Sequence, residues 1–311
     1  MKPIRIASRP SKLALAQTHM TRDALLGLCP DCDITVVPIS TTGDNDKSDF
    51  LYKSQSQGLF TSEVEAALLD GRADMAVHSL KDLPTQGPAE LIVAAMPKRE
   101  SPSDVLITTK PTSDLKDLPS GASVGTSSLR RIAQIKRARP DLNCVPLRGN
   151  VETRLAKVAR GEVDAAVMAH AGLNRLGLSD HISAVLPLSS FLPAPAQGAL
   201  AIQARKDLPE LVALIARLDD PNTRLCVETE RLILAAMHGG CSIPLGVHAS
   251  VQDNQITVSA MIGDTLGQTC IQRTQTVPLD QAFKCAEAMA IDLLDAGGRE
   301  ILEAIRADKE A

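Results

Sequence analysis

The chain has 311 residues, a length that predicts two or three domains of ordinary size. Hydrophobic residues make up 44% and charged residues 23% of the chain, so it can form packed cores and does not have the composition of a disordered protein. It has four Phe, one Tyr and no Trp, too few aromatic side chains for a protein that binds single-stranded nucleic acid by base stacking. The net charge of -4 also excludes a surface that attracts polyanions as a whole, and we expect no nucleic-acid partner.

The first residues of the chain, Met1 to Ile6, enter a strand-like pattern directly and lack the apolar stretch of a secretion signal. No apolar run approaches the ~18 residues that a membrane-spanning helix needs. These features predict a cytoplasmic protein with no membrane partner.

Seven cysteines are scattered along the chain. An odd number of cysteines in a cytoplasmic protein argues against a disulfide framework. Cys29 and Cys32 form a CxxC motif, but the second pair of ligands that a zinc site needs is not visible. We therefore expect this motif to be a surface loop that binds no metal.

A repeated pattern organises the first two thirds of the chain. Residues 71–77 and 161–167 both read Gly-x-x-Asp-x-Ala-Val. Each follows an amphipathic helical pattern, at Leu59–Leu69 and Val151–Ala159, and each glycine lies where a helix is expected to end. The small apolar run after each glycine predicts a buried strand.

The similarity continues upstream of both motifs. Ile4–Ser8 and Ser123–Ser128 each lead from a strand-like run into a helix, and the runs Ile34–Ile39 and Cys144–Leu147 follow. Both repeats therefore predict a β-α-β-α-β order, with parallel strands joined by helical crossovers. Convergence of two unrelated α/β segments on a common Gly-Asp-Ala-Val pattern is the alternative. Two such domains side by side would form a cleft.

Polar and basic side chains follow the predicted strands, where helix N-termini favour anions. Arg130, Arg148 and Arg154 lie at predicted helix starts. A cation there opposes the helix dipole, so anion binding explains these arginines better than local stability does. The basic residues further along the same helix are typical of a solvated face: Lys136, Arg137 and Arg139.

The remainder of the chain predicts a different organisation. Residues 188–195 read as a crossing or hinge, and a helix-rich region follows at about Leu208–Met237. Strand patterns at 247–251, 255–262 and 270–277 then precede a long predicted helix, Asp280–Ile305. This part predicts a separate α+β domain.

An ionisable pair, Lys81 and Asp82, ends the strand of the first repeat. A carboxylate at that edge could act as an acid-base group on a cationic intermediate, and the alternative is a salt-bridged turn before Pro84. His78 is interpreted as a packed, hydrogen-bonded residue because no nucleophile pairs with it.

Cys241 follows two glycines in a loop that opens the last domain. Exposure and nearby cations lower the pKa of a thiol and make it nucleophilic. An inert loop thiol is the alternative, and the local sequence leaves both open.

These elements resemble the porphobilinogen deaminase family, also called hydroxymethylbilane synthases. The matching stretches cover nearly the whole chain, and their combination is specific although no single one is. They are ASRPSKLALAQ (Ala7–Gln17), GLFTSEVEAALLDGRADMAVHSLKDLPT (Gly58–Thr85), VGTSSLRRIAQI (Val124–Ile135), LRGNVETRL (Leu147–Leu155), AGLNRLGL (Ala171–Leu178), PAPAQGALAIQAR (Pro193–Arg205) and GGCSIPLG (Gly239–Gly246).

The resemblance implies a transferase that joins four porphobilinogen molecules head to tail into the linear tetrapyrrole hydroxymethylbilane, with ammonia lost at each addition, in porphyrin and heme biosynthesis. It implies a dipyrromethane cofactor held by a thioether to Cys241, with Asp82 as the catalytic carboxylate. Its further implied cofactor contacts are Lys81, Asp82, Thr126, Ser127, Ser128, Arg130, Arg131, Arg148 and Gly149. Its implied substrate contacts are Arg9, Ser11, Gln17, Phe60, Arg148, Arg154, Arg175 and Gln197.

The fold implied by the resemblance is α/β, with two periplasmic-binding-protein-like domains that have parallel-rich sheets, and a C-terminal α+β domain. The expected boundaries are residues 1–98 with 198–218 for the first domain, 99–197 for the second and 219–311 for the third. The family habit is a monomer. A degenerate non-catalytic homologue, or a small-molecule-binding protein of the same fold, is the alternative function.

Some positions depart from the family pattern. Gln57 and Ser62 replace common lysines on a loop expected to cover the cleft, although Lys53 remains. The other departures are Ala196 for Gly, Gln203 for Glu and Ser103 for Arg. None removes a proposed catalytic group.

Overall fold

A computed structural model describes residues 3–42, 61–237 and 243–310 of the chain. These residues fall into two compact units. Unit 1 contains the described residues up to 42, together with 61–100 and 198–224, and unit 2 contains the described residues of 101–197 and 225–310. The chain thus leaves unit 1 after Glu100, returns at Gly198 and leaves again within one helix.

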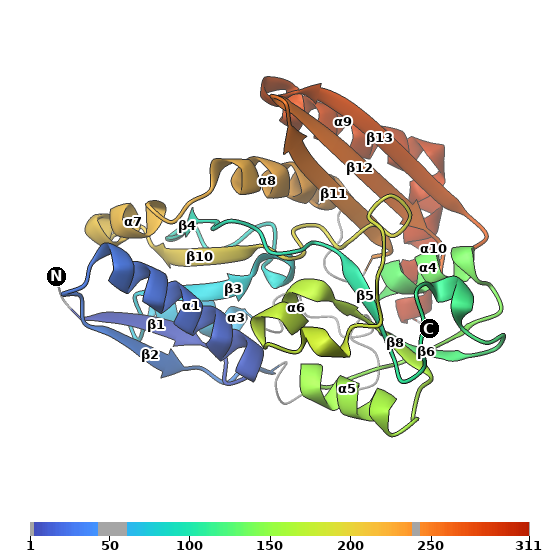
Figure 1. Cartoon of the computed structure of the whole chain (residues 1–311). Helices are drawn as coiled ribbons and strands as arrows, with labels where there is room; N and C mark the ends of the chain where they lie inside the picture. The colour runs from blue at the N-terminus through green and yellow to red at the C-terminus, as the bar shows by residue number, and fades with distance from the viewer. Residues whose placement is uncertain (1–2, 43–60, 238–242, 311) are drawn as a thin grey trace. The chain divides into compact units, whose positions relative to one another are not determined.

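Unit 1 is built on a sheet of five described strands in the order β2-β1-β3-β10-β4 (Figure 1). Its strands are β1 (Ile4–Ser8), β2 (Ile34–Pro38), β3 (Met75–Ser79), β4 (Leu91–Ala95) and β10 (Leu200–Arg205). The three strands of the predicted repeat are parallel, and β10 runs antiparallel to both β3 and β4.

Helices cover both faces of this sheet. They are α1 (Lys12–Leu28), α3 (Ser62–Leu69), α7 (Pro209–Ala216) and the first turn of α8 (Pro221–Ala236). Ile6 packs with residues of α1 and α7 in one hydrophobic cluster, whereas Ala7 packs with residues of α3 in another. Successive residues of a strand point to opposite faces, so β1 contributes to both cores.

Unit 2 contains a second sheet with the same pattern, in the order β7-β6-β8-β5-β9 among the described strands. Its strands are β5 (Asp104–Thr108), β6 (Ser123–Gly125), β7 (Asn143–Val145), β8 (Ala165–Ala169) and β9 (Ala184–Val185). Strand β6 is parallel to β7 and β8, and β5 is antiparallel to β8 and β9. The helices of this part are α4 (Leu129–Ala138), α5 (Val151–Ala159) and α6 (His170–Arg175).

The Gly-x-x-Asp motif has the same role in both repeats. Gly71 and Gly161 follow α3 and α5 with φ of 76° and 70°, the left-handed region that favours glycine. The Asp74 carboxylate accepts a hydrogen bond from the Arg5 backbone N–H at 2.8 Å, and Asp164 accepts one from that of Ser123 at 2.8 Å. Each aspartate thus ties its strand to the first strand of its repeat, which confirms the expected α/β repeat.

The last part of unit 2 is an antiparallel sheet with helices on it, which confirms the expected α+β organisation. Its strands are β11 (Leu245–Gln252), β12 (Gln255–Gly263) and β13 (Cys270–Pro278), and its helices are the remainder of α8, α9 (Ala282–Leu293) and α10 (Arg299–Glu310). One hydrophobic cluster joins residues of all of them. This sheet and the second sheet belong to one compact unit, and the division into three domains stays a prediction.

The prediction of one long helix at Asp280–Ile305 is wrong, because the helix is not continuous. The chain forms two helices, α9 and α10, separated by a π-helical turn at Leu294–Gly298. Within that turn Gly297 has φ of 118°, which no helix accommodates.

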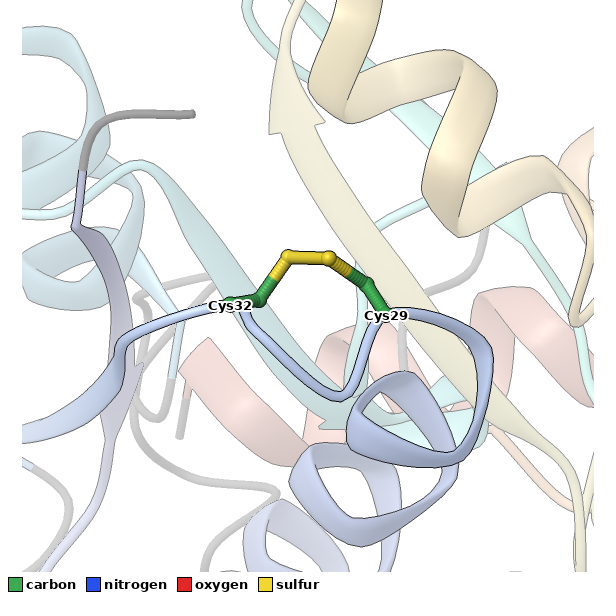
Figure 2. The surroundings of a disulfide bond; sticks show 2 residues. All are labelled: Cys29 and Cys32. Atoms are coloured by element: carbon green, nitrogen blue, oxygen red, sulfur yellow. A yellow bond between two sulfur atoms is a disulfide. The ribbon is translucent and has the colours of Figure 1, made fainter.

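The CxxC motif lies in a loop as expected, but the sequence argument against disulfides fails there, because Cys29 and Cys32 form one (Figure 2). Helix α1 ends at Leu28, and the Cys32 N–H donates to the carbonyl of Cys29, closing a tight turn. This turn brings the two Cα atoms to 5.5 Å, a separation that a disulfide spans.

Among the helices of the described residues, none is both long enough and apolar enough to cross a membrane.

Candidate functional site

A pocket in unit 1 lies where β3 gives way to a short 3₁₀ turn, Leu80–Asp82. Asp82 and Arg9 line it, so a carboxylate and a guanidinium share one small cavity. Its further lining residues are Ser11, Leu13, Ala14, Gln17, Thr61, Val64, Val77, His78 and Ser79. The pocket therefore brings together four of the residues that the resemblance implied: Arg9, Ser11, Gln17 and Asp82.

The start of α1 is fixed to this pocket by polar contacts. The Ser11 hydroxyl accepts the Ala14 N–H at 3.3 Å and caps the helix. The buried Gln17 amide donates to the Ser79 hydroxyl at 3.0 Å, which joins α1 to the end of β3. Both side chains are thereby held in place before any ligand binds.

His78 is buried and lies 3.1 Å, measured from Nε2, from Oε1 of Gln203 on β10. The Gln203 amide in turn donates to Glu65 of α3 at 2.9 Å. Burial lowers the pKa of His78 to about 4, the hydrogen bond with Gln203 opposes this shift, and the positive charge of Arg9 adds to it. The interpretation of His78 as a packed, hydrogen-bonded residue is confirmed.

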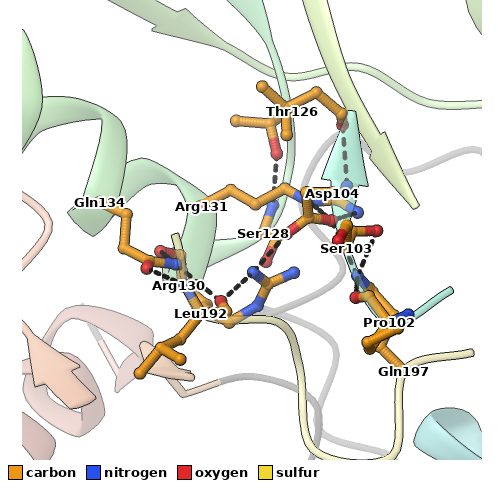
Figure 3. A network of polar contacts seen from close by, with 11 residues as sticks. Pro102, Ser103, Asp104, Thr126, Ser128, Arg130, Arg131, Gln134, Leu192 and Gln197 are labelled. Carbon is orange, nitrogen blue, oxygen red and sulfur yellow. Dashed lines mark hydrogen bonds and ion pairs between the residues drawn. The ribbon is translucent and has the colours of Figure 1, made fainter. Parts of the chain in front are cut away.

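In unit 2 two of the implied arginines, Arg130 and Arg131, converge on one carboxylate, Asp104 (Figure 3). The Nη1 atom of Arg130 donates to it at 2.6 Å, and Nη2 of Arg131 at 2.7 Å. Gln197 donates to the same carboxylate from Nε2 at 3.0 Å. Asp104 is fully buried and both arginines nearly so.

The charges on this cluster are set by mutual pairing. Burial alone would raise the pKa of Asp104, but the charges and hydrogen bonds of Arg130 and Arg131 outweigh burial and hold it well below its ordinary value. One carboxylate between two guanidinium groups leaves the cluster with an excess of one positive charge. The sequence argument took Arg130 to be better explained by a bound anion, because a cation at a helix start opposes the dipole. The ion pair with Asp104 is a structural explanation for Arg130, so its binding to a ligand stays a prediction.

A second glutamine fixes the position of Arg130. The Leu192 carbonyl accepts from Arg130 Nη1 at 2.6 Å and from Gln134 Nε2 at 3.0 Å, and the Leu192 N–H donates to Gln134 Oε1 at 2.6 Å. The Arg130 guanidinium group is thus held by two segments far apart in the sequence, at Asp104 and at Leu192.

Two loops at the strand ends of the second sheet are joined by Ser127. Its hydroxyl accepts the Leu147 N–H at 3.2 Å, next to Arg148. Gly149 has φ of 111°, and a Cβ there would lie 2.7 Å from a side-chain carbon of Thr153, so only glycine fits. Further on, Arg154 donates from Nε to the Gly149 carbonyl at 2.8 Å, which orients this arginine along the loop.

The remaining implied residues are placed as follows. Lys81 lies beside Asp82 in the 3₁₀ turn and is half-buried, as are Arg148 and Arg175. Thr126 is buried and accepts the Ser128 N–H at 3.3 Å. Gln197 is buried in unit 2 and does not line the pocket of unit 1. Phe60, Cys241 and the Gln57 departure lie outside the described residues.

Sequence reasoning did not single out Asp104, Ser79 or Glu65. The signal for Asp104 was an acidic residue that opens an otherwise apolar strand, upstream of a segment with a strong excess of positive charge. Nothing in the periodicity distinguished Ser79 or Glu65, because both contacts join segments distant in the chain.

Comparisons with known proteins match one family over nearly the whole chain. Residues 4–213 match the dipyromethane cofactor binding domain of porphobilinogen deaminase, and residues 224–295 match its C-terminal domain. Porphobilinogen deaminases of Syntrophobacter fumaroxidans and Brevibacillus brevis are each 42% identical to the chain, over 97% and 98% of it and 97% and 99% of their own lengths. That of Maridesulfovibrio salexigens is 43% identical over 98% of the chain and 99% of its own length.

Among solved structures, the chain is similar to a methionine-binding protein with a TM-score of 0.42 and 13% identity, over 69% of the chain and 89% of that protein. It is also similar to the substrate-binding domain of a molybdenum ABC transporter from Clostridium difficile, with a TM-score of 0.46 and 11% identity, over 71% of the chain and 93% of that domain.

The two matching domains together span most of the sequence, and the relatives match from end to end at more than 40% identity. The chain therefore belongs to the porphobilinogen deaminase family, the dipyrromethane-containing hydroxymethylbilane synthases of tetrapyrrole biosynthesis.

Proposed function

We propose that this chain catalyses the head-to-tail joining of four porphobilinogen molecules into hydroxymethylbilane, with Asp82 as the catalytic group. The observation that carries this proposal is the pocket of unit 1, in which Asp82 faces the same cavity as Arg9, Ser11 and Gln17. A carboxylate and anion-binding groups in one cavity suit a substrate that has acidic side chains and becomes cationic during reaction.

Each addition breaks the bond between the substrate's aminomethyl carbon and its nitrogen, and ammonia leaves. The positive charge that remains is shared between that carbon and the pyrrole ring. The Asp82 carboxylate stabilises this charge electrostatically, which lowers the barrier to loss of ammonia. A carbon–carbon bond then forms, the attacked pyrrole carbon loses its proton, and Asp82 is the base that accepts it.

Guanidinium and hydroxyl groups bind the substrate's carboxylates. Arg9 lies in the same pocket as Asp82, with the capping hydroxyl of Ser11 and the fixed amide of Gln17 beside it. Charge-assisted hydrogen bonds contribute about 1.5–3 kcal/mol each, so a few of them suffice to orient one ring.

The residues of unit 2 fit a dipyrromethane cofactor by their chemistry. The cluster of Arg130, Arg131 and Asp104 has an excess of one positive charge, and Arg130 Nε is a buried donor with no hydrogen-bond acceptor among the described residues. A carboxylate of the cofactor would supply the missing negative charge. When bound, the cofactor supplies the pyrrole carbon that receives the first substrate.

The remaining site residues extend this proposal. Lys81, Arg148, Arg154 and Arg175 would bind further carboxylates, and Thr126, Ser127, Ser128 and Gly149 would donate hydrogen bonds from the loops before α4 and α5. Cys241 would form the thioether to the cofactor, and Phe60 would contact substrate. Gln197 would act through Asp104, to which its amide donates.

The test of the catalytic role is Asp82→Asn, which keeps the size of the side chain and removes its charge. We expect turnover of porphobilinogen to fall about 100-fold or more, since an acid-base group commonly contributes that much. The measurement is the rate of ammonia release by the purified full-length protein.

A matched control is available because the tripeptide Leu-Lys-Asp occurs twice as a 3₁₀ turn, at Leu80–Asp82 and Leu115–Asp117. Asp117 is exposed, and its carboxylate accepts the backbone N–H groups of Ser113 and Asp114. Asp117→Asn should leave turnover within about twofold of wild type because surface changes away from a site act weakly. Equal losses in the two variants would remove Asp82 from the mechanism.

Two finer expectations, a monomeric state and a cytoplasmic location, stay predictions. Light scattering on the purified chain tests the first, and fractionation of the producing cells tests the second.

A further inference from the structure

Three buried polar side chains in unit 1 form a hydrogen-bonded row that ends at the Asp82 pocket. The Gln203 amide nitrogen donates to Glu65 Oε1 at 2.9 Å, and its oxygen lies 3.1 Å from His78 Nε2. Each of the three side chains is at most 8% exposed. His78 is the member that lines the pocket.

The fold places these side chains on one face of the sheet. Gln203 of β10 pairs with Ala76 of β3, and His78 lies two residues further along β3. Residues two apart on a strand share a face, so Gln203 and His78 are diagonal neighbours. Ala76 packs with Val64 of α3, the helix that carries Glu65, so α3 covers this face.

The order of donors and acceptors fixes the hydrogen on the imidazole. A carboxylate is an acceptor, so the Glu65 carboxylate takes the amide nitrogen of Gln203 and turns the amide oxygen toward His78. An amide oxygen accepts only, so Nε2 of His78 must be the protonated nitrogen. In the neutral ring Nδ1 then has no hydrogen.

The charge on His78 decides the balance of charge in the pocket. Among the described lining residues Arg9 and Asp82 are the charged ones, and they compensate each other when the imidazole is neutral. The groups that act on His78 are Arg9, which disfavours a proton on the ring, Glu65, which is separated from it by the Gln203 amide, and Asp82 of the same pocket. A protonated His78 would leave the pocket with an excess positive charge.

We propose that Gln203, at a position where the family commonly has Glu, is a positioning residue that isolates His78 from the Glu65 carboxylate and holds the imidazole as the neutral Nε2–H form. At mildly acidic pH the wall of the Asp82 pocket then does not repel the cation formed when ammonia leaves. This inference rests on the proposed function for its consequence, whereas the state of His78 follows from the contacts alone. Gln203 touches no substrate and acts through His78.

An exchange of the amide and the carboxylate tests the proposal. The double variant Glu65→Gln/Gln203→Glu keeps the atoms and the total charge of the row but moves the negative charge next to His78. A carboxylate at hydrogen-bond distance favours the imidazolium. The ratio of variant to wild-type kcat should therefore fall about tenfold as the pH is lowered from about 8.5 to 6, because a repulsion of about 1.4 kcal/mol changes a rate tenfold.

The matched control is Glu65→Gln alone, which removes the carboxylate and leaves the amide of residue 203 beside His78. Its kcat ratio to wild type should not depend on pH over the same range. If this variant and the double variant show the same pH dependence, the charge next to His78 is not what matters, and the proposal is wrong.

Nitrogen NMR of the wild-type chain is the second measurement, and it needs no variant that could fail to fold. With imidazoles labelled with ¹⁵N and the His78 signals assigned through His78→Gln, we expect Nε2 protonated, Nδ1 unprotonated and no titration above about pH 5. A ring protonated on Nδ1, or one that titrates near pH 6.5, would overturn the proposal. In the double variant the same signals should titrate at a higher pH.

Failure of the two claims can be told apart. A wild-type chain that releases no ammonia from porphobilinogen contradicts the proposed function, and the NMR result still decides the state of His78. A second outcome is that the NMR spectra agree with the expectation while the double variant turns over like wild type at every pH. That combination would overturn the functional part of this inference.

Discussion

Asp104 is a buried carboxylate of unit 2 on which two arginines and a glutamine converge. It accepts hydrogen bonds from Arg130, Arg131 and Gln197, and it has no exposure to solvent. Removing one partner from a buried ion pair leaves an uncompensated charge, which costs more than the pair itself contributes. The carboxylate therefore determines how the two implied cofactor arginines are paired and oriented.

Asp104→Asn should lower the free energy of unfolding by about 3–5 kcal/mol because two buried guanidinium groups lose their counter-charge. Urea denaturation at neutral pH measures this loss. Asp141→Asn is the control, since Asp141 also pairs with an arginine, Arg139, but at the surface, where solvent screening makes the expected cost small. Similar losses in the two variants would contradict the central role of Asp104.

His78 predicts a particular dependence of stability on acid. Burial lowers its pKa from 6.5 to about 4, so between these values the unfolded chain binds more protons than the folded chain. The stability contributed by neutral His78 is present above about pH 6.5 and is lost as the pH falls toward 4, by roughly 3 kcal/mol in total. Urea denaturation across this range should therefore give a shallower decline for His78→Gln than for wild type, and parallel declines would contradict the assignment.

Local elements were the part of the fold that could be predicted best. Helix α5 has the bounds Val151–Ala159 that the periodicity gave, and the strands of the repeat lie where the apolar runs placed them. The break at Gly297 in the expected helix Asp280–Ile305 was missed because apolar residues continue at helical spacing on both sides of it. Periodicity records which side chains are buried and does not record a backbone turn.

The Cys29–Cys32 disulfide closes the connection between α1 and β2, whose residues belong to the core of unit 1. Compartment and cysteine count argued against this disulfide. The prediction failed because neither of them reports the distance between two Cα atoms. In the chain-entropy account a disulfide across four residues stabilises the folded state by about 2 kcal/mol.

The double variant Cys29→Ser/Cys32→Ser should lose about this amount in urea denaturation, and a dithiol reductant should destabilise wild type equally. The variant itself should not respond to the reductant. If wild type is also insensitive while its mass shows reduction, the disulfide does not stabilise the fold.

At the scale of the whole molecule the internal repeat was the most informative signal. It gave two α/β sheets, and the Asp74 and Asp164 contacts explain why the motif recurs. The antiparallel strands β10 and β5 could not be foreseen, because a strand's direction leaves no mark on its residue pattern.

Part of the candidate site could be predicted from the sequence, and part depends on contacts between distant segments of the chain. Arg9, Ser11, Gln17 and Asp82 were named and do share one pocket. Asp104, which pairs with Arg130 and Arg131, and Gln203, which lies between His78 and Glu65, were not named as site residues. Their partners come from distant segments of the chain, so finding these contacts needed the fold.

The central claim is that this chain builds a dipyrromethane cofactor and elongates it at the Asp82 site. Intact-protein mass spectrometry of the chain, purified from a host that makes porphobilinogen, tests this claim most directly. The native protein should have the added mass of two pyrrole units, Cys241→Ser should lack it, and Cys144→Ser should retain it. An unmodified native mass, or an adduct that persists in Cys241→Ser, would contradict the account.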